Sequence, residues 1–242
     1  MELGTGSRVV VTGASRGIGA AVANAFEAHG CTVGRLSRSG ELAADVAERE
    51  SLVRAIEGFG TVDVLVANAG IAHYLPFAQT PPDLIEQMTK VNWLGTAYSV
   101  QAVLPGMLER RRGHLAIVSS GAGIRSFPGA AVYGATKAAQ RGFGEALRHE
   151  LKGTGVGLTM VYPGQIRSSL HDHEKERMPD WYKLDRAVPA EPLAKAILEA
   201  VRQDRGEVFH PPNVRLLRIL HGVRPSLADA LLRRMMDRSA AP

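Results

Sequence analysis

The sequence predicts an α/β fold, in which a doubly wound, Rossmann-like parallel sheet lies between two layers of helices in a three-layer α/β/α arrangement. Two observations support this prediction. Short apolar runs alternate along the chain with longer stretches whose apolar residues recur at helical spacing. Glycine-rich or polar motifs follow several of the apolar runs, and right-handed crossovers bring the carboxyl ends of such strands to one ligand-binding edge.

Seven short apolar segments predict the strands. The first, Val9–Val11, ends at Thr12, and the segment at 114–119 is apolar on both faces, as expected of a buried parallel strand. The link between residues 36 and 62 is short for two strands and two helices, so we expect one crossover to be cut down. The predicted strands cover residues 9–12, 32–36, 41–46, 62–67, 114–119, 156–162 and 207–210.

Four longer segments have the apolar periodicity of helices. The first is closed by Gly30, and the last carries Pro192 near its start, where a helix tolerates proline. The second is expected to form either one long helix or two joined ones. The predicted helices cover residues 18–29, 82–108, 132–151 and 191–202.

The chain is expected to form one domain over residues 1–210, followed by a tail over residues 211–242, because its 242 residues suit a single large α/β domain. No run approaches the roughly 18 apolar residues of a membrane span, and the N-terminus has no signal-peptide pattern. Cys31 is the only cysteine, which excludes an internal disulfide and favours a reducing, cytoplasmic location. The net charge of +5 is too small to indicate a nucleic-acid partner.

The tail is basic and amphipathic. Between residues 213 and 238 it carries six arginines against Asp229 and Asp237. It can pack against the body or a partner subunit, or lie on an anionic membrane surface and make the protein peripheral to the membrane. Its apolar residues are expected on two helical faces, before and after Pro225: Leu216, Leu217, Leu220 and Val223, then Leu227, Leu231 and Met235.

A glycine-rich turn joins the first strand to the first helix. Its spacing is Gly-x-x-x-Gly-x-Gly, formed by Gly13, Gly17 and Gly19. Glycines there let the backbone approach a pyrophosphate, and the helix N-terminus offers free N–H groups and the positive end of its dipole. A plain tight turn is the alternative, but the position between a strand and a helix favours a dinucleotide site.

Further motifs follow in order along the chain. They are Asn68-Ala69-Gly70 after the fourth strand, Asn92 in the long helix, Ser120 after the fifth strand, Tyr133-x-x-x-Lys137 in a helix, and Pro163-Gly164 after the sixth strand. Together with the glycine spacing, they resemble the short-chain dehydrogenase/reductase family in its single-domain form. The resemblance covers residues 8–210 and implies a nicotinamide cofactor.

Tyr133 and Lys137 are four residues apart in a predicted helix, so their side chains share one face. By itself such a pair is most often an ordinary surface pair. Within the resemblance, Tyr133 is the acid/base, and we expect the Lys137 ammonium to lower its pKa from roughly 10. Ser120 stands at the family's spacing from Tyr133, which selects it over Ser119 as the group that polarises the carbonyl. Asn92 is implied to bend its helix and to hold, through its backbone carbonyl, a water linked to Lys137.

The segment Leu36-Ser37-Arg38-Ser39 has no carboxylate to hold a ribose 2′-hydroxyl. Arg38 and Arg16 could instead clamp a 2′-phosphate, which predicts NADP(H) over the alternative of two solvated arginines. By resemblance, Asp45-Val46 meets the adenine, and Ile166 and Ser168 hold the carboxamide. The predicted cofactor-binding residues are Gly13, Ser15, Arg16, Gly17, Ile18, Gly19, Ser37, Arg38, Asp45, Val46, Asn68, Ala69, Gly70, Tyr133, Lys137, Pro163, Gly164, Ile166 and Ser168.

These features predict an NADPH-dependent carbonyl reductase or alcohol dehydrogenase that transfers a hydride between nicotinamide and a ketone or secondary alcohol. A catalytically idle NADP-binding scaffold or sensor of the same fold is the alternative. A sugar-nucleotide epimerase is disfavoured by the chain length and the glycine spacing. We expect a hydrophobic small-molecule carbonyl substrate and a homodimer or homotetramer.

The substrate pocket is expected to be walled by 73–75, 124–127, Gln165 and a mobile lid over 169–186 that contains the apolar Met178, Trp181 and Tyr182. His171, Asp172, His173 and Glu174 could form a metal-ligand cluster, but the charged run 171–177 is expected to be a solvated loop with no metal.

Overall fold

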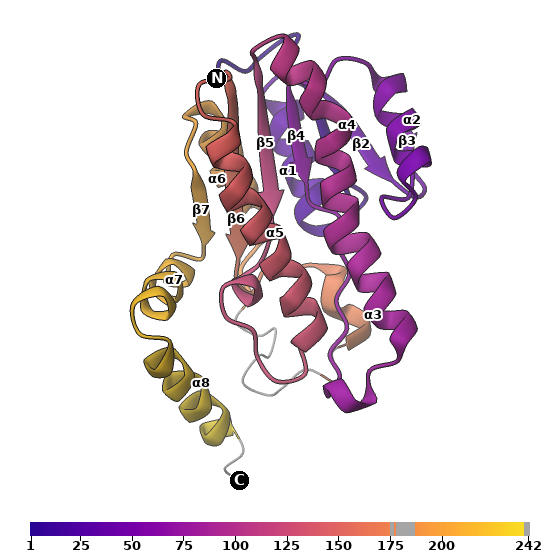
Figure 1. Ribbon diagram of the computed structural model, residues 1–242. Coiled ribbons are helices and arrows are strands. Elements are labelled where there is room, and N and C mark those ends of the chain that lie inside the picture. Colours follow the sequence, from indigo (N-terminus) through magenta and orange to yellow (C-terminus); the bar gives the residue numbers. More distant parts are fainter. Residues whose placement is uncertain (175–176, 178–186, 240–242) are drawn as a thin grey trace.

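The computed structural model describes residues 1–174, 177 and 187–239. Its described part contains a seven-stranded sheet in the order β3-β2-β1-β4-β5-β6-β7, in which every pairing is parallel. The predicted doubly wound α/β fold is therefore confirmed (Figure 1). The strands are β1 (Arg8–Thr12), β2 (Thr32–Ser37), β3 (Leu42–Ala43), β4 (Val64–Ala67), β5 (Gly113–Val118), β6 (Val156–Pro163) and β7 (Glu207–His210).

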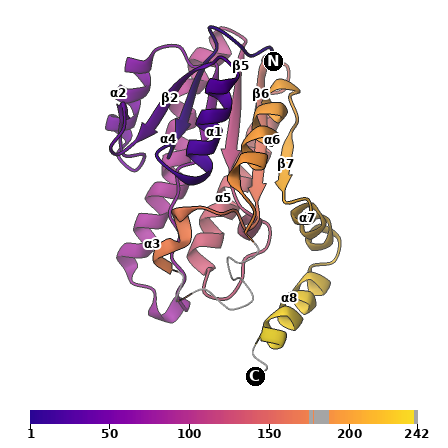
Figure 2. The same cartoon turned by 180° about the vertical axis from the view of Figure 1, so that it is seen from behind.

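Helices cover both faces of this sheet, as Figures 1 and 2 show from opposite sides. On one face α1 (Gly17–Ala28) packs beside α6 (Ala190–Arg202), and on the other lie α2 (Arg49–Phe59), α4 (Gly95–Glu109) and α5 (Ala131–Glu150). The remaining helical segments are η1 (Phe77–Gln79), α3 (Pro82–Met88), η2 (Thr89–Leu94), η3 (Gly121–Gly123), η4 (Ser169–Glu174), α7 (Asn213–Val223) and α8 (Pro225–Ser239).

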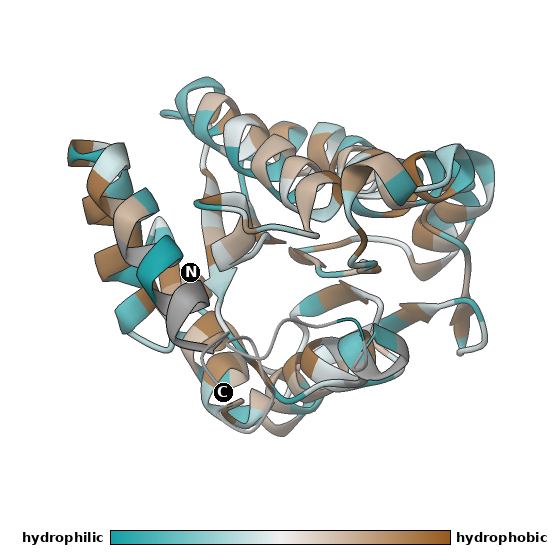
Figure 3. Ribbon diagram, turned by 90° about the horizontal axis from the view of Figure 1, so that it is seen from below, coloured by the Kyte–Doolittle hydropathy of each residue, from teal (hydrophilic) through white to brown (hydrophobic). Residues whose placement is uncertain are grey.

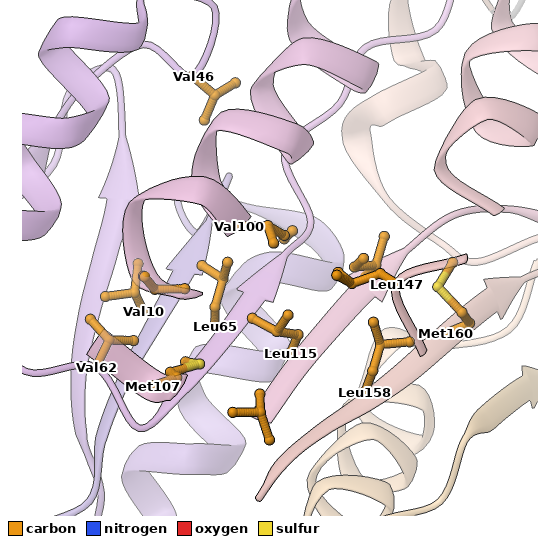
Figure 4. Close-up of a cluster of buried hydrophobic side chains, with 14 of the residues drawn as sticks. Val10, Val46, Val62, Leu65, Val100, Met107, Leu115, Leu147, Leu158 and Met160 are labelled. Atoms are coloured by element: carbon orange, nitrogen blue, oxygen red, sulfur yellow. The ribbon is translucent and has the colours of Figure 1, made fainter. Parts of the chain in front are cut away.

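The hydrophobic core has two parts because alternate strand residues point to opposite faces of the sheet. Val9 and Val11 of β1 join the cluster under α1 and α6, whereas Val10 joins the cluster under α2, α4 and α5. Figure 4 shows this second cluster, in which Val10, Leu65 and Leu115 lie side by side on neighbouring strands and meet side chains such as Met107 of α4. Burial on both faces explains why the strands are continuous apolar runs.

The predicted strand over 41–46 is wrong in length, since β3 has only two residues. Its pairing with β2 ends at Ala43, and the Asp45 carboxylate then accepts the Ala47 N–H at 2.9 Å. This turn leads the chain directly towards α2. The other predicted strands and helices are present with ends shifted by at most two residues. The long helix 82–108 is a pair of α-helices joined by the π-helical segment η2.

After β7, helices α7 and α8 extend past the carboxyl ends of the strands (Figures 1 and 2). The residues predicted to share one face of α7 do not all do so: Leu217 packs against the core, whereas Leu216 and Val223 are exposed. The side chains of Leu231 and Met235 lie outside the described residues. No helix in the described part of the chain is long and apolar enough to cross a bilayer.

Candidate active site

A cleft of about 500 Å³ opens at the carboxyl ends of β1, β2, β4, β5 and β6. All the predicted site residues line it except Gly19 and Asn92, which lie just behind its wall. The parallel sheet thus brings together residues as distant in the sequence as Gly13 and Ser168. A larger hollow, of about 810 Å³, lies at the opposite edge around Arg112 and Arg148 and contains none of them.

The glycine turn has the shape of a cradle. Gly13 has φ +66°, and a Cβ there would lie 2.9 Å from Ala69 Cα, so any side chain would collide with the next strand's end. A Cβ at Gly19 would collide with the Gly13 carbonyl, which is why α1 can approach the turn so closely. The Thr12 hydroxyl accepts the N–H groups of Asn68 and Ala69, both at 3.0 Å, and so ties the ends of β1 and β4 together.

Helix α1 presents an open N-terminus to this cradle. Its N-cap residue, Arg16, has extended backbone angles, and its side chain does not cap the first turn. Gly17 has φ +59°, and a Cβ there would lie 3.0 Å from the Ser168 side chain, so the first turn sits against the far lip of the cleft. Free N–H groups and the positive dipole end make this a place for an anionic group.

At one end of the cleft the charged side chains are exposed. Arg16 and Arg38 both lie on the surface there, with Ser37 half-buried between them and Asp45 nearby. One Asp45 oxygen is engaged with the Ala47 N–H. Because Arg16 and Arg38 outnumber the Asp45 carboxylate, these three side chains together carry a net positive charge.

At the other end the reactive side chains are buried. Tyr133 and Lys137 lie on α5, and Ser120 lies directly behind β5, where its hydroxyl hydrogen-bonds to Tyr133. The Ser119 hydroxyl instead donates to the Lys137 backbone carbonyl at 2.8 Å. The structure therefore separates the two serines in the way the spacing predicted. The Lys137 ammonium donates to the Val118 carbonyl at 3.0 Å.

Burial moves the pKa values of both groups. It raises the pKa of Tyr133 to about 12, with the Ser120 hydrogen bond acting in the opposite direction. It lowers the pKa of Lys137 to about 7. Lys137 Nζ lies 5.9 Å from the centre of the Tyr133 ring and bonds to Val118. The expected lowering of the Tyr133 pKa is thus wrong for the chain by itself, and the phenol is protonated at neutral pH.

Asn92 lies in the π-helical segment η2, so the expected distortion of its helix is present. Its amide accepts the Ile71 N–H at 2.8 Å and donates to the Ile71 carbonyl at 3.0 Å. Its backbone carbonyl accepts from Gln140 Nε2 and from the Thr96 hydroxyl, both at 2.8 Å. Two protein donors therefore occupy the carbonyl that was expected to hold a water, and sequence reasoning did not identify Gln140.

The buried side chains packed against Tyr133 include two further aromatic rings. The Tyr74 ring meets the Tyr133 ring edge-on at 6.0 Å and lies 5.7 Å from the Phe127 ring. Tyr74 and Phe127 belong to the two segments that were expected to wall the substrate pocket, but both are buried and neither lines the cleft. Another ring, which no local sequence pattern predicted, joins this group: His171 stacks on Tyr74 at 5.6 Å, and its Nδ1 lies 3.0 Å from the Tyr74 hydroxyl.

The solvated loop expected at 171–177 is wrong for two of its residues, because His171 and Glu174 are buried. The Glu174 carboxylate lies 2.8 Å from His73 Nδ1 and accepts the Tyr74 N–H at 3.2 Å. Segment η4 is thereby attached to the segment that carries His73 and Tyr74. Within the described ranges no three His, Cys, Asp or Glu residues are grouped as metal ligands. Met178, Trp181 and Tyr182 of the expected lid lie outside the described residues.

Comparison with known proteins gives a consistent family match. The family model described as short chain dehydrogenase matches residues 42–179. An uncharacterized oxidoreductase of Myxococcus xanthus is 38% identical over 185 residues, which cover 76% of this chain and 71% of that protein. The glycine betaine reductase ATRR of Emericella nidulans is 39% identical over 188 residues, which cover 69% of this chain but only 15% of that much longer protein.

Solved structures show the same architecture. A 3-oxoacyl-[acyl-carrier protein] reductase from Brucella melitensis, with bound NAD, has a TM-score of 0.74 and 28% identity, covering 85% of this chain and 90% of that one. A short chain dehydrogenase from Burkholderia cenocepacia, in complex with NADP, has a TM-score of 0.84 over 97% of this chain and all of that one; its 23% identity supports the fold alone.

Proposed function

This chain belongs to the short-chain dehydrogenase family of oxidoreductases, and on that premise we propose that it transfers a hydride between NADP(H) and a ketone or secondary alcohol. One observation carries the proposal. Ser120, Tyr133 and Lys137 are grouped at the buried end of a cleft whose exposed end holds Arg16 and Arg38. A proton donor thus lies at one end of the cleft and an anion-binding cradle towards the other, in the layout that a dinucleotide and a carbonyl need.

The cleft residues fit a nicotinamide dinucleotide. Side chains at Gly13 and Gly17 would obstruct the turn, and the open first turn of α1 can receive the pyrophosphate. Arg16 and Arg38 support NADP(H) over NAD(H), because a guanidinium pairs with a phosphate through two charge-assisted hydrogen bonds. Ile166 and Ser168 also line the cleft, and by resemblance to the family the Ile166 backbone and the Ser168 hydroxyl would hold the carboxamide.

The chemistry follows from the buried end. The bound nicotinamide supplies the hydride in the reductive direction. Tyr133 Oη donates its proton to the substrate oxygen, a role that suits a phenol whose burial keeps it protonated at neutral pH. The Ser120 hydroxyl, which is bonded to Tyr133 in the chain alone, can donate to the same oxygen and stabilise the charge that develops there. In its protonated form, Lys137 would favour the phenolate that remains after the proton transfer.

The substrate side of the cleft favours a hydrophobic ketone. Tyr74 and Phe127 pack with Tyr133 in a buried apolar cluster behind the cleft. Ile71 and Leu170 pack against this cluster and line the cleft itself, so the group beside the reacting carbonyl would meet apolar side chains. Such a wall gains free energy by removing apolar surface from water, and it offers few hydrogen bonds to a polar substrate.

The proposal is tested by following NADPH oxidation with a panel of hydrophobic ketones, aldehydes and acyl thioesters. We expect turnover with medium-sized ketones and its loss in Tyr133→Phe. Tyr162→Phe is the matched control, because Tyr162 is a buried tyrosine on β6 that does not line the cleft. NADPH binding without turnover of any compound would instead support the idle scaffold.

A further inference from the structure

The C-terminal arm, which we define as residues 213–239 of α7 and α8, has an outer apolar face that the fold does not use. Leu216, Ile219 and Val223 are 65%, 54% and 80% exposed, and their spacing of three and four residues places them on one side of α7. Leu227 follows at the start of α8 and is also exposed. Figure 3 shows hydrophobic residues on the side of these helices that faces away from the body.

Helix α7 does not need this face in order to fold. Its opposite side is anchored to the body by Val214, which is buried, and by Leu217, which packs on the core. Arg218 adds an ion pair with Glu145 at 2.9 Å, and its guanidinium lies 5.8 Å from the Tyr162 ring. Since these contacts already hold the helix, the outer apolar residues are free to meet something else.

The charges around this outer face are unbalanced. Arg218 is paired with Glu145, and Asp229 is paired with Arg125 of the body at 2.5 Å, so both are neutralised within the chain. The exposed arginines of the arm have no acidic partner in the described part of the chain, and they are Arg215, Arg224, Arg233 and Arg234. The arm therefore combines an apolar ridge with surplus positive charge.

We propose that this arm docks on an anionic membrane surface, with the ridge of Leu216, Ile219 and Val223 inserted among the lipids and the arginines at the headgroups. The positive charge of the arm favours an anionic membrane over a second copy of the chain. A symmetric pairing of two arms would bring the same arginines together, whereas anionic lipid neutralises them. With 11 residues, α7 is about 16 Å long and suits a position along the surface.

The docked arm would hold the cleft near the bilayer. Val214 at the root of α7 packs on Gly164, which lines the cleft, because a Cβ at Gly164 would lie 3.0 Å from a Val214 methyl group. A hydrophobic substrate could then enter from the lipid. The docking itself does not depend on the proposed reaction, so it can be tested without a substrate.

The test is co-sedimentation of the full chain with vesicles of phosphatidylcholine, either alone or with one third phosphatidylglycerol. We expect binding only to the anionic vesicles and its loss at high salt. Ile219→Glu and Val223→Glu should each weaken this binding at least tenfold. The double change Arg233→Gln with Arg234→Gln should weaken it about 25-fold, at roughly fivefold per arginine. Phe77→Glu is the control, since Phe77 is 64% exposed but lies on η1, away from the arm.

Three outcomes would overturn the proposal. The first is absence of binding to anionic vesicles, and the second is equal binding by the wild-type chain and both glutamate variants. The third is a wild-type chain that does not bind vesicles but forms a dimer in analytical ultracentrifugation, which Ile219→Glu converts to a monomer. That result would assign the ridge to an interface with a second copy of the chain. Circular dichroism melts confirm that each variant is folded.

Discussion

The two ends of the cleft offer a bound molecule opposite environments. Around Arg16 and Arg38 the side chains are exposed, and they interact with a bound molecule through their charge. Around Tyr133 and Lys137 the side chains are buried, and the protein itself has displaced both pKa values. Substitutions at the exposed end should therefore change the cofactor preference without disturbing the fold. Tyr133 and Lys137 are part of the buried core, so replacing them should change stability as well as activity.

The largest effect should come from Tyr133→Phe, which keeps the ring but removes the proton donor. We expect kcat for ketone reduction to fall roughly 10³-fold, because a positioned acid contributes about that factor. NADPH binding, followed by nicotinamide fluorescence, should stay within about threefold of wild type. Retention of kcat in this variant, with Tyr162→Phe unchanged as the control, would remove Tyr133 from the mechanism.

Lys137→Met should change stability in a way that depends on pH. In the folded chain the lysine pKa is about 7, below its usual 10.5, so the cost of burying the charge is fully present below pH 7 and is relieved as the pH rises towards 10.5. The variant should therefore gain most stability at pH 6, and its advantage should shrink by about 1.4 kcal/mol per pH unit above 7.

This prediction is checked by urea unfolding of the cofactor-free protein at pH 6 and pH 9. Lys152→Met is the control, because Lys152 is exposed and should give no such slope. A difference between Lys137→Met and wild type that does not vary with pH would show that the ammonium is not desolvated.

Arg38→Asp should alter cofactor preference and leave the fold intact. The loss of a charge-assisted phosphate contact should lower kcat/KM for NADPH roughly ten- to hundredfold, with little change for NADH. The melting temperature should stay at the wild-type value because Arg38 is exposed. Arg54→Asp, at another exposed arginine, serves as the control, and unchanged preference in Arg38→Asp would argue against NADP(H).

The smallest effect should come from Gln140→Leu, which removes the donor to the Asn92 carbonyl and to Thr96. We expect a loss of about 1–2 kcal/mol in the free energy of unfolding, because one buried carbonyl then has fewer donors. Activity should fall less than in Tyr133→Phe. Gln101→Leu, at an exposed glutamine of α4, is the comparison, and equal stability of the two variants would show that the Asn92 contact is not stabilising.

The fold and the residues that line the cleft could be predicted from the sequence, because both depend on local sequence patterns. The glycine turn, the strand-end motifs and the helical spacing of Tyr133 and Lys137 are each read from a few adjacent residues, and parallel topology then brings them to one edge. The direction of the Tyr133 pKa change could not be predicted, because it depends on burial beside Tyr74 and Phe127 from distant segments. The contact between Tyr74 and His171, 97 residues apart, likewise had no local signal.

The most direct test of separate roles for the two ends of the cleft compares Tyr133→Phe with Arg38→Asp. Cofactor binding and single-turnover ketone reduction are measured in both variants. We expect opposite defects in the two variants. Tyr133→Phe should bind NADPH normally but transfer no hydride on the wild-type timescale, whereas Arg38→Asp should bind NADPH weakly yet reduce the ketone at the wild-type rate with saturating NADH. Loss of both binding and turnover in each variant, with both proteins folded, would contradict the separation of roles between the two ends.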